Sequence, residues 1–172
     1  NGAYDDVISV LESLGYRRTG NAAEGSLIVE FPGIMSNPTL RKMQEGAELA
    51  SRMDVGLIIA IGGGSVMDSA KLASVSLTDE YVVKDLLDDP QRAHKCVSLL
   101  AIPTTAGAGS ETTVAAVITD SATHRKASIN DPFLIPKYAV LDPELTVGLP
   151  PHTTATTGTL FMRMSLPTES GI

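Results

Sequence analysis

Residues 62–65 (GGGS) have the composition and setting of an anion-binding loop. They directly follow the apolar run LIIAI at 57–61, and a helical pattern begins at Ser65. Glycines let the backbone come close to a phosphate, and the start of a helix offers unpaired N–H groups and the positive end of a dipole. Ser65 adds a hydroxyl donor and can serve as the helix N-cap. The pattern predicts a phosphate site, and the competing interpretation is a tight turn without a ligand.

The glycine segment matches neither standard nucleotide loop. In the pattern GxGxxG the third glycine would fall at Met67, and no Lys-Ser or Lys-Thr pair follows at the spacing of a Walker loop. Asp68 and Lys71 stand one turn apart in the expected helix. They can form a surface ion pair worth about 0.2–0.5 kcal/mol, or Asp68 can face a ligand, and their spacing alone favours neither.

A second polar segment, residues 103–111 (PTTAGAGSE), follows the apolar run VSLLAI at 97–102. Open parallel sheets bind ligands just beyond the carboxyl ends of their strands. The hydroxyls of this segment are therefore candidates to contact a base, a ribose or a phosphate. The alternative is a plain surface loop, in which Gly, Ser and Thr are common.

The strands expected to position these loops are short and apolar. The runs at 57–61 and 97–102 do not alternate, which is typical of a parallel sheet covered on both faces. Shorter strands are expected at 27–31 and 138–141, and residues 114–119 with 126–129 predict a hairpin. Because helical segments separate the strands, we expect an open α/β sheet.

Three longer helices are expected between these strands. Apolar positions at helical spacing predict a helix over 5–14, and Gly15 lies where a C-cap glycine belongs. Asn37, as N-cap, followed by Pro38 at the first helical position predicts the start of a second helix. A third helix is expected over 65–77, and the polar segment 79–95 can hold a short one.

Composition excludes several classes of protein. The 172 residues carry 13 Lys+Arg and 20 Asp+Glu, a formal charge of −7, which argues against a nucleic-acid binder. The single Cys96 excludes an intramolecular disulfide, and His94, His124 and His152 lack the spacing of a metal site. No apolar run approaches the ~18 residues of a membrane span, and no signal peptide is visible. We expect a soluble, cytoplasmic protein.

Four segments resemble one family, the iron-containing (group III) alcohol dehydrogenases. Residues 62–71 (GGGSVMDSAK) are similar to its GGGSxxDxAK segment, and residues 103–111 to its PTTAGTGSE segment. Residues 36–39 (SNPT) resemble its NPT turn, and 142–151 (DPELTVGLPP) its DPxLTxxLPP stretch. The opening residues 1–5 (NGAYD) resemble the NGxYD of butanol-dehydrogenase-like members. The second and fourth segments favour this family over its glycerol dehydrogenase and dehydroquinate synthase relatives.

The resemblance implies a Rossmann-like α/β fold with helices on both faces of the sheet. It further implies an oxidoreductase that uses NAD or NADP and Fe²⁺ or Zn²⁺ to interconvert small alcohols with aldehydes or ketones, and that pairs as a homodimer. In the family's pattern, the glycine loop holds the pyrophosphate of the cofactor, and the carboxylate at Asp68 lies near the nicotinamide. The threonines at 104 and 105 lie near the adenosine, and the lysine at 126 reaches the ribose. The implied cofactor-binding residues are Gly62, Gly63, Gly64, Ser65, Asp68, Thr104, Thr105, Ser110 and Lys126.

Both ends of the chain depart from the family pattern. The family has a strand before its NGxYD segment, so residues 1–158 are expected to form the nucleotide-binding domain without its first strand. After TATTG the family continues with MDALxH, whose Asp is a metal ligand, whereas this chain reads TLFMR at 159–163. We therefore expect an irregular tail over 159–172, no metal ligands, no all-helical C-terminal domain and weak or absent activity. The alternative function is a non-catalytic nucleotide-binding module or remnant.

Overall fold

A three-stranded parallel sheet carries the fold. The computed structural model describes residues 2–18, 27–77, 85–89, 93, 95–120 and 125–165, to which all structural statements refer. The strand order is β1-β2-β5, with bounds β1 Leu57–Gly62, β2 Ser98–Pro103 and β5 Tyr138–Ala139. β1 and β2 pair along their whole length, from Leu57 opposite Ser98 to Gly62 opposite Pro103. The predicted parallel α/β sheet is confirmed.

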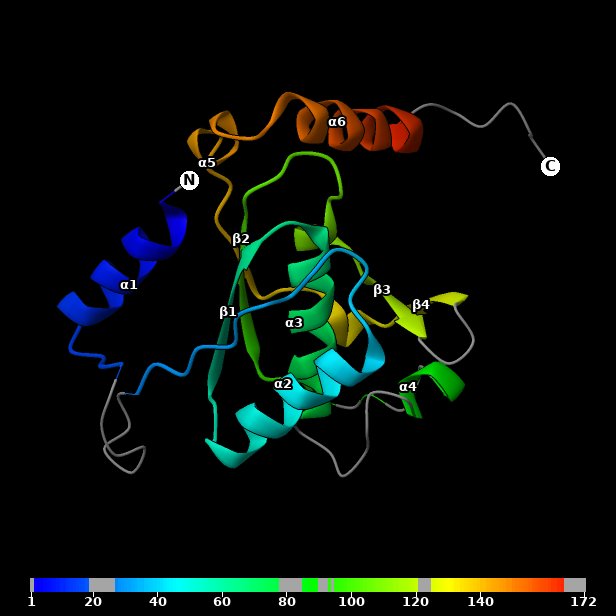
Figure 1. Ribbon diagram of the computed structural model, residues 1–172. Coiled ribbons are helices and arrows are strands. Elements are labelled where there is room, and N and C mark those ends of the chain that lie inside the picture. Colours follow the sequence, from blue (N-terminus) through cyan, green and yellow to red (C-terminus); the bar gives the residue numbers. More distant parts are fainter. Residues whose placement is uncertain are drawn as a thin grey trace.

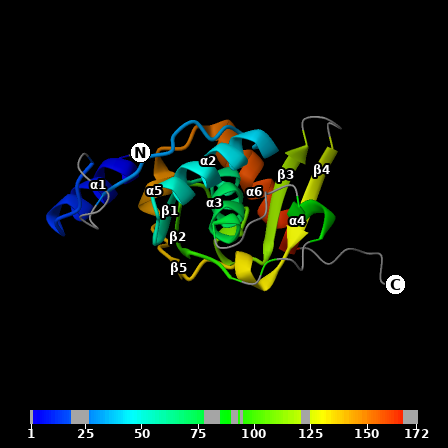
Figure 2. The ribbon, with the colours of Figure 1, turned by 90° about the horizontal axis from the view of Figure 1, so that it is seen from below.

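A two-stranded hairpin forms a second, separate sheet. Its strands β3 (Ala115–Asp120) and β4 (Arg125–Asn130) are antiparallel, with Ala115 opposite Asn130. Figure 2 shows the hairpin on the far side of helix α3 (Gly64–Ser76) from the sheet, with β4 as the outer strand. The predicted hairpin is confirmed.

Helix α3 is buried on two sides and thereby connects the sheet to the hairpin. Towards the sheet, its Met67 packs with Ala60 of β1 and Leu99 of β2. Towards the hairpin, its buried residues belong to a second apolar cluster, which comprises Met43, Leu72, Val75, Leu86, Ala93, Ala116, Ile118, Ile129 and Leu134. Because residues on both of these sides are buried, α3 occupies the centre of the core (Figure 1).

Two further helices lie on opposite sides of the sheet. Helix α2 (Leu40–Arg52) packs against α3, whereas α1 (Ala3–Ser13) lies on the other side of β1 and β2 (Figures 1 and 2). Helices on both sides were predicted. Ile59 and Leu100, which lie opposite each other in β1 and β2, are only half-buried.

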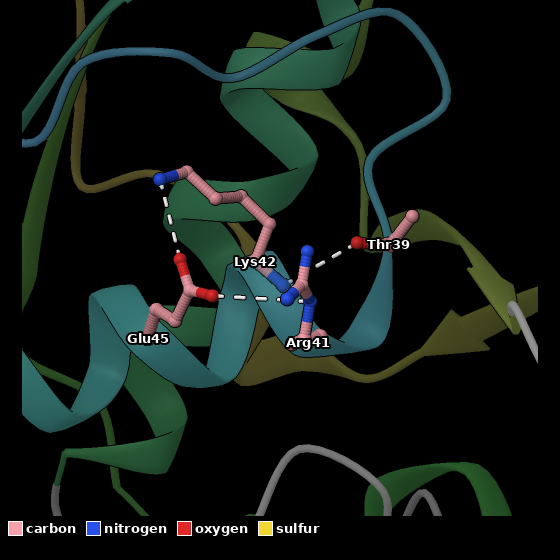
Figure 3. A network of polar contacts seen from close by, with 4 residues as sticks. All are labelled: Thr39, Arg41, Lys42 and Glu45. Atoms are coloured by element: carbon pink, nitrogen blue, oxygen red, sulfur yellow. Dashed lines mark hydrogen bonds and ion pairs between the residues drawn. The ribbon is translucent and has the colours of Figure 1, made fainter.

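Helix α2 begins two residues later than predicted. Its N-cap is Thr39, whose Oγ1 accepts a hydrogen bond from the Lys42 amide over 3.3 Å (Figure 3). Asn37 instead adopts a left-handed conformation with φ 58°, which Asn tolerates better than most residues. One turn on, Glu45 pairs with Lys42 at 3.3 Å and with Arg41 at 3.9 Å.

The strand predicted over residues 27–31 does not form. Leu27 makes a single bridge to Arg17, and the residues that follow have no strand partner in the described chain. Their apolar side chains are accommodated by packing: Val29 and Phe31 line a cavity against α2 and β1. The apolar residues of this run are half-buried, but a strand also requires a neighbour to hydrogen-bond with.

The last described residues are helical. The remaining elements are α4 (Asp85–Asp88), the 3₁₀ helix η4 (Pro132–Leu134), α5 (Glu144–Val147) and α6 (Pro151–Ser165). Residues 159–165 therefore differ from the irregular tail that was predicted, because Leu, Met and Arg favour helices and Pro167 lies beyond the helix end. Residues 166–172 lie outside the described chain. None of the helices within it is both long enough and apolar enough to cross a membrane.

Helix α6 approaches the backbone of the segment 103–111 at one glycine. Gly107 has φ 138°, a conformation that other residues rarely adopt, and a Cβ at this position would overlap the carbonyl oxygen of Thr157. The helix backbone, which cannot move aside as a flexible side chain could, therefore occupies the space that a side chain would need.

This contact predicts unequal costs for two neighbouring glycines. Gly107→Ala should lower the free energy of unfolding by about 2 kcal/mol or more, because it combines left-handed strain with overlap against α6. Gly109→Ala is the matched control: Gly109 has φ 63° but open space around its Cβ position, so about 1 kcal/mol is expected. Urea unfolding of both variants measures the difference, and equal costs would contradict the contact.

Candidate functional site

The two glycine-rich segments form one site beyond the carboxyl ends of β1 and β2. Their approach depends on glycine, because side chains would occupy the space between them. One hydrogen bond joins the segments: the Thr104 amide donates to the Gly62 carbonyl over 2.9 Å. A Cβ atom added to Gly63 would lie 3.1 Å from Thr105 Oγ1, and one added to Gly64 would lie 3.0 Å from the Ala108 Cβ. The glycines therefore have a packing reason as well as the predicted ligand reason.

The first turn of α3 presents free donors at this site. Its N-cap is Gly63 and not, as predicted, Ser65, which is the second residue of the helix. The amides of Val66 and Met67 both donate to the Gly63 carbonyl, at 2.9 and 3.1 Å. Within the described chain the amides of Gly64 and Ser65 and the Ser65 hydroxyl have no hydrogen-bond acceptor. Two amides, one hydroxyl and the helix dipole are the donor set that a phosphate requires.

Asp68, one turn into α3, connects the helix to both neighbouring elements. Its Oδ1 accepts a 2.6 Å hydrogen bond from the hydroxyl of Ser110, on the 3₁₀ helix η3 (Ser110–Thr112). Its Oδ2 accepts a 3.0 Å hydrogen bond from the amide of Val117 on β3. Asp68 and Ser110, both predicted site residues, are thus brought together, and the Asp68 carboxylate faces η3 and β3.

Lys71 is fully buried, so a surface ion pair between Asp68 and Lys71 is excluded. Its Nζ donates to three acceptors at 2.8–3.2 Å, namely the carbonyl and hydroxyl oxygens of Thr113 and the carbonyl oxygen of Ala115. Burial lowers the pKa of Lys71 to about 8, while the charges of Asp68 and Glu111 oppose the shift. The sequence carried no direct signal for this role, because a lysine at a helical spacing from an aspartate is usually exposed.

Lys126 stands apart from the other predicted site residues. It is exposed on β4, opposite Thr119, and makes no hydrogen bond or ion pair with those eight residues in the described chain. Residues 121–124, which connect the two strands of the hairpin, lie outside the described chain. The structure therefore joins eight of the predicted residues through two adjoining loops and α3, and leaves the ninth on the outer strand.

The described residues do not form a metal centre. No group of three or more His, Cys, Asp or Glu side chains among them is placed to hold a metal ion. His152 is exposed on α6, and His94 and His124 lie outside the described chain. The residues present thus do not fit the metal that the family resemblance implies.

A cavity of about 180 Å³ lies elsewhere, between α2, α3, β1 and residues 29–34. Its lining is almost entirely apolar and includes Phe31, Met43 and Ile58. None of the nine predicted site residues lines it. The chemistry of the glycine loops and this apolar space are therefore separate features.

Comparison with known proteins decides the family. The model of the iron-containing alcohol dehydrogenases matches residues 6–143. The chain belongs to this family. A choline dehydrogenase from Bacillus subtilis is 38% identical over 160 residues, which cover 91% of this chain and 37% of that protein. An NADH-dependent butanol dehydrogenase A from Clostridium acetobutylicum is 30% identical over 155 residues, or 90% and 37% of the two chains.

Solved structures of the family share the fold. The butanol dehydrogenase A of Thermotoga maritima superposes with a TM-score of 0.79 at 29% identity, covering 91% of this chain and 37% of that one. A sulfoacetaldehyde reductase from Bifidobacterium kashiwanohense, solved in complex with NAD⁺, gives 0.76 at 29% identity, covering 92% and 41%. The chain thus spans about two fifths of the length of these family members, and the predicted family is confirmed.

The buried lysine predicts a pH-dependent stability. The folded pKa of Lys71 is about 8 and the ordinary value is 10.5. Between these values the unfolded chain binds more protons at this position than the folded one, so the contribution of Lys71 to the free energy of unfolding rises with pH, on the order of 2–3 kcal/mol.

Urea unfolding of the native chain and of Lys71→Met at pH 7 and pH 10 tests this. The native chain should gain stability over this interval relative to the variant, which has no titrating group at position 71. An identical pH response in the two proteins would show that folding does not lower the pKa of Lys71.

Proposed function

We propose that this chain is the cofactor-binding part of an NAD(P)-dependent alcohol dehydrogenase, an enzyme that interconverts small alcohols with aldehydes or ketones. Membership of the iron-containing alcohol dehydrogenases supports the class of reaction. The observation that carries the proposal is the uncapped start of α3, where the amides of Gly64 and Ser65 lie free beneath residues 103–111.

The site fits a dinucleotide better than a single phosphate because its polar groups extend along α3. The pyrophosphate would be held at Gly63, Gly64 and Ser65, where donors without acceptors converge. Thr104 and Thr105 would lie along the adenosine half, and Asp68 near the nicotinamide. Bound NAD or NADP supplies hydride transfer, and the residues described here bind and orient it.

Binding experiments test the cofactor proposal. Titration calorimetry should detect NAD or NADP and show tighter binding than ADP, because a dinucleotide also reaches Asp68. Ser65→Ala should weaken dinucleotide binding about tenfold, the usual effect of removing a hydrogen bond to a charged group. Ser76→Ala, at the opposite end of α3, is the matched control and should bind like the native chain. Equal affinity for ADP and NAD would favour the alternative of a general nucleotide-binding module.

Turnover is expected to be weak or absent. The described residues offer no ligand set for the metal that would polarise the substrate oxygen. Oxidation of short primary alcohols, followed at 340 nm with NAD or NADP and added Fe²⁺ or Zn²⁺, should therefore stay near background. Robust, metal-dependent turnover by this chain alone would contradict the proposal.

A further inference from the structure

Lys71 and Asp68 both contact one short segment, residues 110–117, from the same side of α3. The Asp68 carboxylate receives the Ser110 hydroxyl at 2.6 Å and the Val117 amide at 3.0 Å, the two ends of the segment. Between them, the Lys71 ammonium donates to Thr113 and Ala115. The lysine therefore holds the middle of the segment whose two ends bind the carboxylate.

These contacts occupy the part of the β3 edge that precedes Thr119, whose amide donates to the Pro38 carbonyl over 3.1 Å. The amide of Val117 and the carbonyls of Thr113 and Ala115 belong to alternate residues, so they point to the side of the strand away from β4. An unpaired edge needs both a donor and an acceptor, and α3 supplies them as an ammonium and a carboxylate one turn apart. The two groups form no ion pair with each other, so their hydrogen-bonding capacity goes to β3 and η3.

The Lys71 contacts leave the ammonium little freedom. It is fully buried and has an acceptor for each of its three N–H bonds. Replacing it with an apolar side chain would leave two carbonyl oxygens without a donor in a place from which water is excluded, and the segment would have to shift to satisfy them. Such a shift would remove the donors that fix the Asp68 carboxylate.

We propose that Lys71 is a positioning residue for the cofactor site: by holding residues 113–115, it fixes Ser110 and Val117 against Asp68 and so sets the orientation of that carboxylate. The inference rests on the proposed function, since it assigns Asp68 to the nicotinamide end of the cofactor. The inference adds Lys71 to the residues that affect the cofactor, although Lys71 acts only through Asp68.

The test separates positioning from general stability by using two ligands. Lys71→Met, of similar length and without a charge, should raise the dissociation constant for NAD about tenfold or more, because an orienting contact to the ligand is lost. The constant for ADP, which lacks the nicotinamide half, should change less than twofold. Val75→Ala is the control: Val75 is equally buried one turn further along α3, so it lowers stability while leaving both constants unchanged.

A second measurement does not depend on the ligand. Amide hydrogen exchange at Val117 should become faster in Lys71→Met by more than the loss of global stability explains, and in Val75→Ala only by as much as that loss. If Lys71→Met fails to fold, Lys71→Gln retains one amide donor in less volume and should show the same changes to a smaller degree.

The outcomes distinguish the two proposals. Failure of the native chain to bind NAD would overturn the proposed function, and Val117 exchange would still report on positioning. Native affinity for NAD in a folded lysine variant, or equal weakening for NAD and ADP, would overturn the inference. Amide exchange at Val117 that is no faster in Lys71→Met than the loss of global stability explains would also overturn the inference.

Discussion

A buried ammonium group needs hydrogen-bond acceptors, and in this chain the acceptors of Lys71 determine how α3 packs against the hairpin. Lys71 finds its acceptors on the side of the segment 113–117 that faces away from β4, where the described residues supply only a single bridge, from Thr39 to Thr119, and no paired strand. The same edge offers an amide that needs an acceptor, and Asp68 provides it. Two charged side chains of α3 thus hold the hairpin and η3 against the helix that begins at the glycine loop.

The glycine loop shows how one residue type serves two requirements. Without Cβ atoms at Gly63 and Gly64, the segment 103–111 can lie directly on the start of α3. The Gly64 and Ser65 amides also have no acceptor among the described residues, and such unpaired amides at a helix start can bind an anion. Packing between the loops and access for a ligand are therefore compatible at these positions, and a sequence pattern cannot separate the two.

Sequence predicted the parts of the fold that periodicity and composition determine. The non-alternating runs of β1 and β2, the hairpin and the family motifs all correspond to structure, because each leaves a local pattern. Two failures show what composition and periodicity leave out, one a missing partner strand and the other a local turn. Residues 27–31 have strand composition but no neighbour to pair with, and Thr39 caps α2 because Asn37 takes a left-handed turn instead.

Lys71 is the clearest case of a long-range effect within the site. The sequence placed it correctly on α3 beside Asp68, but its burial depends on β3, which follows more than forty residues later. Similarly, the family motif identified Ser110 and Asp68 separately, whereas their 2.6 Å hydrogen bond emerges only when η3 packs on the helix. Residue types gave the candidates, and tertiary packing gave their partners.

The contact between Gly107 and α6 couples two parts of the chain that are often treated as independent. Because the helix backbone rests on a position without a side chain, no rotamer change can absorb a displacement between them. A movement of α6 towards Gly107 would therefore have to displace the backbone of the loop that adjoins the start of α3. The backbone of α6 thus limits, on one side, where that loop can lie.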